Sequence, residues 1–435
     1  MNQTEMTALI DQQWPLFLKD LDRMLKIASV QGPAEPGAPF GVEPKRALTA
    51  VTALGQAYGF KTEIVNDAMA YVQWGPDDQN YIGIVGHLDV VAAGKGWHFP
   101  PFSLSEQAER YYGRGILDNK GAIMACLFGM KLLKEAGITL KQTVRLIFGS
   151  NEESGSQDVA LYLQQERPPL FGFTPDCKFP VVYGERGIVN YRITTKLTPA
   201  TLARISDFVG DQAKDHVPDC LAVSVDDQYF EAKGRQTPTN APQLGINAIT
   251  VLAADLLAYQ QGPSELLMYA QWLKTRLANQ HYGEGLGLNY EDDASGRLIM
   301  TPYLWQKTAT GFALELAIRY PITIQETQIT QQLQQVLPER STLEIIRSIP
   351  GVRKSPEAPF IKTLSRIYTE ITGLDGTPVT TTGATYARVM PNIVAFGPSF
   401  PGQKGIAHKQ DEWLNKADLK QMMAIYMAAI EAMAN

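Results

Sequence analysis

The chain has 435 residues, 45% of them hydrophobic, and its 39 basic and 45 acidic side chains leave a net charge of −6. This composition excludes a largely disordered chain, and the acidic balance argues against nucleic acid or an anionic membrane surface as a partner. The three cysteines lie far apart, which argues against a disulfide framework. Because there is neither a secretory signal nor an apolar run of about 18 residues, we expect a cytoplasmic protein that enters no membrane.

The hydrophobic pattern predicts helices and strands that alternate along the chain. Helices are expected over residues 1–30 and 44–58, with a Pro/Gly-rich loop between them, and over 122–135 and 159–165. Short apolar runs predict strands at 81–85, 144–148, 181–183 and 393–396. This alternation predicts an α/β fold with a central, mostly parallel sheet.

The pattern changes between residues 191 and 352. Strand-like segments such as 191–194 and 312–318 flank helical stretches there, and the α/β pattern resumes near Pro359. We therefore interpret residues 1–190 and 353–435 as one domain, and residues 191–352 as an α+β domain inserted into it.

Carboxylate and imidazole side chains lie close to the predicted strands. His87 follows the strand at 81–85, Glu153 follows the strand at 144–148, and His408 lies a loop beyond the strand at 393–396. Asp118 lies in a glycine-rich segment, and Asp176 comes just before the strand at 181–183. Because sites in open α/β sheets form outside the carboxyl ends of strands, we expect these five side chains to converge. Together they would suit two divalent cations, of zinc, cobalt or manganese.

Two further carboxylates accompany the five. Asp89 lies two residues after His87 in an extended segment, so it faces the same side and could hold the ring of His87. Glu152 adjoins Glu153, and a carboxylate beside a metal-activated water is the expected general base. Each feature alone is commonly structural, and a Glu pair before Ser-Gly is usually a solvated turn. Walker A, Gly-x-Ser-x-Gly and His-Glu-x-x-His motifs are absent from the sequence.

Eight stretches of sequence, which cover most of the chain, carry a resemblance to a known family. They are GHLDVVAAGKGW (86–97), GRGILDNKG (113–121), NEESG (151–155), PDCKFPVVYGERG (175–187), PQLGINA (242–248), IRYP (318–321), TTGATYAR (381–388) and AFGPSFPG with HKQDE (395–412). The chain resembles the aminoacylase/carnosinase-type dinuclear zinc metallopeptidases, and most closely the bacterial dipeptidases called dipeptidase V, which are similar to Xaa-His dipeptidases.

The resemblance implies a role for each of these residues. His87, Asp118, Glu153, Asp176 and His408 would bind two metal ions, with Asp118 between them. It further implies that Asp89 orients a ligand, that Glu152 is the catalytic base, and that Arg319 binds the carboxylate of a small peptide substrate. The inserted domain would be a lid, and its length resembles the doubled lid of enzymes that act as monomers, so we expect a monomer or a weak homodimer.

The predicted lid departs from the family pattern at two positions. Pro238 stands where the family has a histidine that stabilises the oxyanion, and Asp215 stands where it has an asparagine. Proline can donate no hydrogen bond, and the loss of one oxyanion donor typically costs a factor of ~10²–10³ in turnover. His216, next to Asp215, is a candidate replacement for the missing donor.

Three functions therefore remain open. The first is a metal-dependent dipeptidase that hydrolyses dipeptides with a free N-terminus, with Glu152 as the general base. The second is a catalytically weakened, metal-bearing relative that binds peptides, which the residues at 215 and 238 favour. The third is an amidohydrolase of the same scaffold that acts on N-acyl or carbamoyl amino acids.

Overall fold

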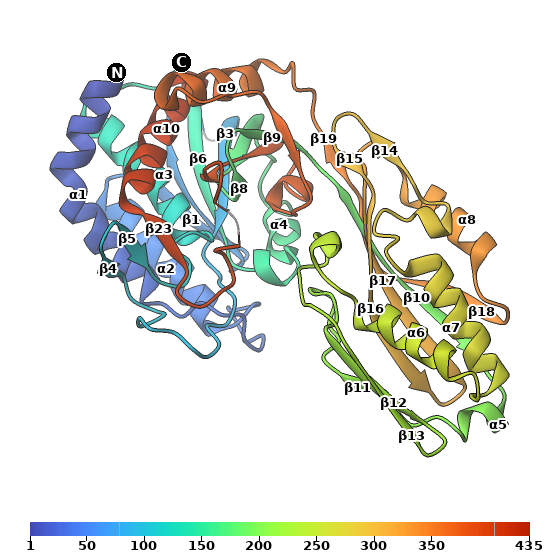
Figure 1. The fold of residues 1–435 in the computed structure, drawn as a ribbon. Coiled ribbons are helices and arrows are strands. Elements are labelled where there is room, and N and C mark those ends of the chain that lie inside the picture. The colour runs from blue at the N-terminus through green and yellow to red at the C-terminus, as the bar shows by residue number, and fades with distance from the viewer. Residues whose placement is uncertain (78, 404) are drawn as a thin grey trace. The chain divides into compact units, whose positions relative to one another are not determined.

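The computed structural model describes residues 1–77, 79–403 and 405–435, and the chain forms two compact units (Figure 1). The first unit consists of Met1–Tyr183, Lys354–Val379 and Gly383–Asn435. The second consists of Gly184–Arg353 and Thr380–Thr382. Among the described residues, no helix is long and apolar enough to cross a bilayer. That residues 191–352 act as a lid stays a prediction.

A twisted mixed sheet forms the centre of the first unit, with the strand order β1-β2-β6-β3-β7-β21-β9. The strands are β1 (Lys61–Val65), β2 (Met69–Trp74), β3 (Tyr81–His87), β6 (Thr143–Gly149), β7 (Phe171–Thr174), β9 (Val181–Glu185) and β21 (Ile393–Phe396). The four central strands, β6, β3, β7 and β21, run parallel, and the outer strands β1, β2 and β9 pair antiparallel. The carboxyl ends of the central strands therefore meet at one edge of the sheet.

The side chains of the central strands belong alternately to two hydrophobic cores, one on each face of the sheet. In β3, Ile82 and Ile84 join the larger core, whereas Tyr81 and Val85 join the smaller core on the opposite face. Successive side chains of a strand point to opposite faces, so an apolar run of this kind is suited to a strand covered on both sides. The predicted continuous apolar runs are thus buried strands, because helices cover both faces.

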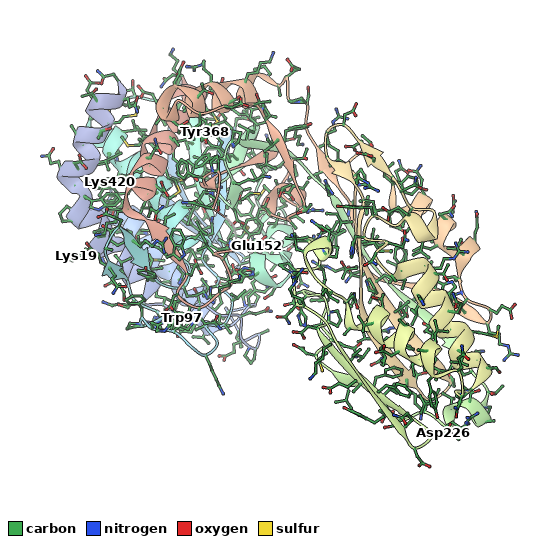
Figure 2. The ribbon with its side chains drawn as sticks, in the orientation of Figure 1. Lys19, Trp97, Glu152, Asp226, Tyr368 and Lys420 are labelled. Atoms are coloured by element: carbon green, nitrogen blue, oxygen red, sulfur yellow. The ribbon has the colours of Figure 1, made fainter. Side chains whose placement is uncertain are left out.

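The larger core lies under five helices of the first unit. They are α1 (Gln3–Leu25), α2 (Val42–Ala57), α3 (Lys120–Glu135), α9 (Pro359–Thr372) and α10 (Lys416–Ala434). Figure 2 marks Tyr368 on α9 and Lys420 on α10. The smaller core lies under α4 (Gln157–Tyr162) and the 3₁₀ turn η4 (Tyr386–Arg388). α1 begins with a capping box, in which Asn2 accepts from the N–H of Glu5 and Glu5 accepts in return.

Short strands outside the main sheet bring distant segments of the first unit together. β4 (Ser105–Gln107), β5 (Arg110–Tyr112) and β23 (Trp413–Asn415) form a small antiparallel sheet, and β8 (Cys177–Lys178) pairs with β22 (Pro398–Ser399). These pairings connect the C-terminal segment to loops that follow β3 and β7.

The second unit has its own core, sheets and helices. Its four-stranded antiparallel sheet has the order β16-β17-β10-β18, and a three-stranded sheet has the order β11-β12-β13. The strands are β10 (Gly187–Lys196), β11 (Val209–Gly210), β12 (Cys220–Val225), β13 (Gln228–Lys233), β14 (Glu291–Asp292), β15 (Gly296–Arg297), β16 (Ile299–Thr308), β17 (Gly311–Tyr320) and β18 (Ser341–Ile349). The helices are α5 (Pro199–Leu202), α6 (Ala248–Tyr259), α7 (Ser264–Leu277) and α8 (Glu326–Val336). The chain passes between the units at β9, β19 (Val352–Arg353) and β20 (Val379–Thr381).

The α/β fold with a parallel centre agrees with the prediction from the sequence, and one strand that matters for function was missed. Asp176 was expected only to precede the strand at 181–183. In the structure it follows β7, the short run Phe171-Gly172-Phe173-Thr174, which pairs with β3. Two phenylalanines separated by a single glycine form too short a pattern to predict a strand. Asp176 therefore lies at the carboxyl edge for the same reason as His87.

Candidate metal centre

The ends of the parallel strands place the predicted site residues of the first unit. His87 is the last residue of β3, and Asp176 follows β7 by two residues. Glu152 and Glu153 lie in the 3₁₀ turn η1 (Glu152–Ser154), three residues beyond β6. Figure 2 marks Glu152 at this turn. Asp118 immediately precedes Asn119, the N-cap of α3, and His408 lies in the loop between β22 and β23.

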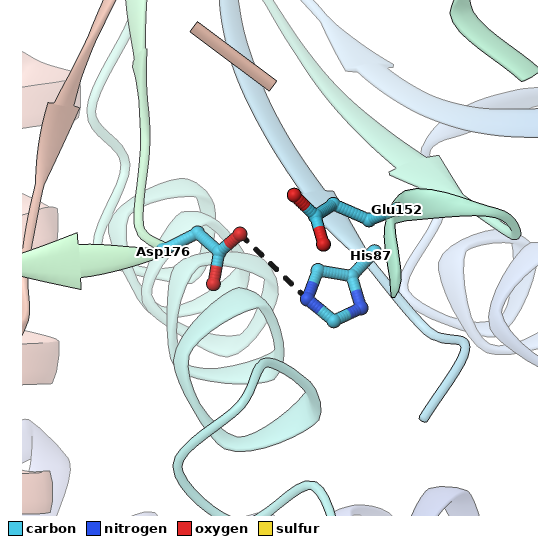
Figure 3. Close-up of side chains that lie close together, drawn as sticks. All are labelled: His87, Glu152 and Asp176. Atoms are coloured by element: carbon cyan, nitrogen blue, oxygen red, sulfur yellow. Dashed lines mark ion pairs between the residues drawn. The ribbon is translucent and has the colours of Figure 1, made fainter. Parts of the chain in front are cut away.

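The carboxylate of Asp118 lies between two imidazoles. Its Oδ1 is 3.1 Å from Nε2 of His87, and its Oδ2 is 3.1 Å from Nε2 of His408. Nε2 of His87 is also 3.7 Å from Oδ2 of Asp176 (Figure 3), and Nε2 of His408 is 3.0 Å from Oε1 of Glu153. We call His87 with Asp176 the first subsite and His408 with Glu153 the second subsite; Asp118 is shared by both.

The site contains two groups of three side chains. Within each group, the three potential ligand atoms, one from each side chain, lie within 4.8 Å of one another. The groups are His87, Glu152 and Asp176, and His87, Asp118 and Glu153. Glu152 thus lies against the first subsite, as Figure 3 shows. The structure brings all five predicted ligands and Glu152 into one cluster.

Hydrogen bonds fix the ring of His87 with Nε2 toward the cluster. Its Nδ1 lies 2.8 Å from the backbone oxygen of Asp89, so Nδ1 donates and Nε2 is left as the nitrogen that can bind a cation. The Asp89 carboxylate is 3.5 Å from that ring. It accepts instead from the backbone N–H groups of Glu152, at 3.2 Å, and Glu153, at 3.1 Å. Asp89 therefore holds the turn that carries both glutamates.

Two residues that sequence reasoning missed support the same turn. Asp158, which is fully buried, accepts from the backbone N–H groups of Ser150 and Asn151 at 2.8 and 3.0 Å and from the hydroxyl of Tyr386. The ring of Tyr386 lies edge-on to that of His87, with centroids 6.4 Å apart. Burial raises the pKa of Asp158 to about 6. No sequence pattern signals a carboxylate whose partners are backbone groups.

Asn119 ties two strand ends together beside Asp118. Its Oδ1 accepts from the backbone N–H of His87 at 3.3 Å, and its Nδ2 donates to the backbone oxygen of Pro175 at 2.5 Å. Pro175 precedes Asp176, so one buried amide sets the spacing between the two members of the first subsite. No pattern in the sequence distinguishes Asn119 from its charged neighbours Asp118 and Lys120.

The electrostatics of the cluster show a need for positive charge. Burial raises the pKa of Asp176 to about 7, and burial together with the charge of Asp176 raises the pKa of Glu152 well above its usual range. Burial would lower the pKa of His87, but Asp176 and Asp118 raise it well above the ordinary value. Hydrogen bonds to Asp118 and Glu153 raise the pKa of His408 to about 11. These shifts favour bound protons, and divalent cations in the same place would compensate the carboxylates instead.

The donor set fits two divalent cations. Three carboxylates and two imidazoles surround a shared, half-buried Asp118, and oxygen with imidazole nitrogen is the ligand set of zinc, cobalt and manganese sites. A carboxylate that presents one oxygen to each side can bridge a pair of ions about 3.5–4 Å apart. The residues present therefore suit the predicted centre, and they do not choose among the metals.

The three predicted lid residues belong to the second unit. Arg319 is the penultimate residue of β17 and donates to the backbone oxygen of Thr382 at 2.8 Å. Asp215 is exposed, and its Oδ1 is 2.9 Å from Nδ1 of His216. His216 and Pro238 form an isolated antiparallel bridge, so the two residues lie directly opposite each other. The part of these residues in a substrate site stays a prediction.

Comparison with known families and relatives points to peptidases. The model of Peptidase family M20/M25/M40 matches residues 83–432. The putative dipeptidase YtjP of Bacillus subtilis is 30% identical over 453 aligned positions, which cover 96% of this chain and 97% of the relative. The Beta-Ala-Xaa dipeptidase of Lactobacillus delbrueckii subsp. lactis is 31% identical over 456 positions, which cover 95% of each.

Solved structures with low sequence identity share the fold. Human carnosine dipeptidase 1 superposes with a TM-score of 0.63 at 15% identity, with 99% of this chain and 98% of that chain covered. Aminoacylhistidine dipeptidase from Vibrio alginolyticus superposes with a TM-score of 0.60 at 13% identity, with 96% of each chain covered. At these identities the likeness establishes the fold and nothing finer.

Proposed function

Because this chain belongs to the peptidase family M20/M25/M40, we propose that it is a metal-dependent dipeptidase that hydrolyses dipeptides with a free N-terminus. The observation that carries the proposal is the Asp118 carboxylate, which presents one oxygen to each of two imidazoles. The names of the two bacterial relatives, both dipeptidases that align along almost the whole chain, support the substrate class.

The chemistry proposed for the site divides between the cations and the side chains. Two bound divalent cations would lower the pKa of a water molecule and polarise the carbonyl of the peptide bond. Glu152, which lies against the first subsite, takes a proton from the attacking water and returns it to the leaving amine. Burial and the charge of Asp176 raise the pKa of Glu152, which is the direction in which a carboxylate must shift to act as a general base near neutral pH.

We propose that the second unit supplies substrate contacts. Arg319 would bind the carboxylate of the dipeptide, for which the planar guanidinium is well suited. Its hydrogen bond to the backbone oxygen of Thr382, at 2.8 Å, holds the side chain in place at the end of β17. Asp215 and His216 would lie near the peptide carbonyl, as the resemblance implies.

The decisive experiment measures metal content and activity on the same preparation. Protein stripped with a chelator is loaded with zinc, cobalt or manganese, and is assayed on dipeptides, on the same dipeptides acetylated at the N-terminus, and on N-carbamoyl amino acids. We expect about two ions per chain and hydrolysis of the free dipeptides. Fewer than one ion per chain with every metal would refute the metal centre.

The same panel separates the alternatives. Two bound ions without hydrolysis of any compound would favour the weakened relative that binds peptides, for which Pro238 and Asp215 are the specific residues. Preferential hydrolysis of the acetylated or carbamoyl compounds would favour the amidohydrolase. Zinc is the first expectation for the metal, and the panel decides among the three.

A further inference from the structure

Glu412 is a buried carboxylate that binds the loop carrying Asp118. Only 1% of Glu412 is exposed, and its Oε1 accepts from the backbone N–H groups of Gly115, Leu117 and Asp118 at 3.1, 2.9 and 3.1 Å. Its Oε2 accepts from the guanidinium of Arg114, also buried, at 2.7 Å. Three donors on one oxygen fix the backbone at Asp118 to the C-terminal segment.

That C-terminal segment also carries His408, four residues before Glu412. The side chain of His408 is 53% exposed, whereas His87 is fully buried, so packing of the ring alone does not hold it. His408 and Asp411 both have positive φ, of 63° and 51°, a region that is uncommon for residues other than glycine, although Asp and His adopt it more often than most. Because the ring of His408 is more than half exposed, contacts of the neighbouring residues contribute to its position.

Contacts around Glu412 supply this fixation. The N–H of Gly113 donates to the backbone oxygen of Glu412 at 3.0 Å, and β23 continues from there as the partner of β5. Asp411 accepts from the backbone N–H of His98 at 2.9 Å and contacts the imidazole of His98 at 2.6 Å. The segment 411–415, which follows His408 directly, is thus attached to the segment 98–118 at several positions.

We propose that Glu412 is a positioning residue, which sets the separation between Asp118 and His408 and thereby assembles the second subsite. Its carboxylate touches the backbone of one ligand and belongs to the same short segment as the other, without reaching the cluster itself. The inference rests on the proposed function, because it assumes that the cluster binds cations.

Two substitutions of Glu412 separate the effect of where its carboxylate lies from the effect of its charge. Glu412→Asp keeps the charge but shortens the side chain by one methylene, so the carboxylate cannot reach all three N–H groups while β23 stays paired. Glu412→Gln keeps the length and an acceptor oxygen. We expect the Kd for the second-subsite ion to rise ~100-fold in Glu412→Asp and ~10-fold in Glu412→Gln, the range found when the supports of metal ligands are lost.

The measurement is a Co²⁺ titration of chelator-stripped protein, followed by calorimetry and by the visible absorption of bound cobalt. His408→Ala identifies the binding phase of the second subsite, and Asp176→Asn identifies that of the first. Glu106→Gln serves as the matched control, because Glu106 is an exposed carboxylate of the neighbouring strand β4 that pairs with Lys416. It should leave both phases unchanged.

Each outcome decides between the inference and its premise. A larger loss of affinity in the second phase than in the first supports positioning by Glu412, because Asp118 is shared by both subsites whereas His408 belongs to the second alone. If the wild-type protein holds two ions and the Glu412 variants bind the second ion unchanged, the inference is wrong and the proposed metal centre stands. An equal loss of affinity in both phases also overturns the inference, because a general loss of stability would produce it. If the wild-type protein holds no cobalt, the proposed metal centre and the inference fall together. If Glu412→Asp does not fold, the selectivity of the Glu412→Gln effect decides.

Discussion

Glu152 and Glu153 are neighbours in the sequence with different surroundings in the site. Glu153 contacts His408 in the second subsite, whereas Glu152 lies by His87 and Asp176. We predict that Glu152→Gln lowers hydrolysis by a factor of ~10²–10⁴, the usual contribution of a general base, and keeps both ions. Glu153→Gln should weaken the binding of one ion. Metal analysis and initial rates on the same preparations provide the measurement.

The prediction depends on the difference in metal content between Glu152→Gln and Glu153→Gln. Both substitutions remove one carboxylate of the same length from the same 3₁₀ turn, so each serves as the control for the other. Equal losses of metal in the two variants would show that Glu152 is itself a ligand, and the assignment of the base would then be wrong.

His216 and Pro238 lie opposite each other in the second unit, so the sequence difference at Pro238 can be tested in either direction. If no group replaces the family histidine, Pro238→His should raise turnover, by up to ~10²-fold, the typical contribution of an oxyanion donor. If His216 has taken over the task, Pro238→His should leave turnover flat or reduce it. The same substrates and metal as for the wild-type protein serve for this measurement.

His216→Ala is the complementary variant. A large loss of turnover with unchanged metal content would support His216 as the donor. The absence of any effect from both variants would instead strengthen the alternative of a weakened relative that binds peptides. Asp215 complicates the role of His216, because it contacts the same ring at 2.9 Å.

At the scale of residues, the sequence predicted the side chains that the structure brings into one cluster, together with Asp89 beside them, and missed the other groups that hold the cluster in place. His87 and Glu153 could be predicted because each follows a recognisable apolar strand. Asp158, Asn119 and Glu412 could not, since they bind backbone N–H and C=O groups, which lie eight residues away for Asp158, 32 for Asn119 and 295 for Glu412. Such partners leave no periodicity or motif in the sequence.

The end of β6 shows how an element transmits its geometry to the site. A Cβ added to Gly149, the last residue of β6, would lie 1.7 Å from the hydroxyl of Tyr386 and 2.7 Å from Oδ2 of Asp158. We predict that Gly149→Ala lowers the free energy of unfolding by about 1–3 kcal/mol, as overpacking of a filled core does. Turnover should also fall, because Tyr386 must move and its ring packs against His87.

Urea unfolding and initial rates of hydrolysis check this prediction. Gly262→Ala is a suitable control, because a Cβ there would meet no atom closer than 3.6 Å. If Gly149→Ala were as stable and as active as the control variant, the packing of Tyr386 on the strand end would be unimportant for the site.

At the scale of elements, helices and strands with a strong hydrophobic pattern could be predicted, whereas short strands could not. The strand at 393–396 and the helix before Gly137 agree closely with β21 and α3. The hairpin of β1 and β2 and the short strand β7 were missed, because runs of four to six residues with glycine or charged residues carry little signal. Their pairing with longer neighbours, which the local sequence does not reveal, makes them strands.

The chain as a whole contains separate hydrophobic cores in its two units. All five predicted ligands belong to the first unit, so cations that bind the folded state should stabilise that unit alone. We predict two transitions in differential scanning calorimetry, of which added metal raises only one. At a free metal concentration of 100 times the Kd, each independent site adds about 2.7 kcal/mol to the free energy of unfolding. This is enough to shift the midpoint of the transition by several degrees.

The chelator provides the reverse measurement on the same sample. Its addition should lower the metal-sensitive transition and leave the other in place. A single transition that shifts as a whole would show that the two units unfold together. The expectation of a monomer or weak homodimer is open to light scattering on the same preparations, and a concentration-dependent transition would indicate association.

The order of the ligands along the chain has a consequence for how the protein acquires its metal. The first ligand is His87 and the last is His408, and each comes from a different strand end or loop. No two of the five are neighbours, so the unfolded chain offers no local chelating segment of the kind that a zinc finger uses. If these residues bind the ions as proposed, the nascent chain must complete the segment that carries His408 and fold before it can retain both ions. Metal supply would then limit the activation of finished molecules and not their synthesis.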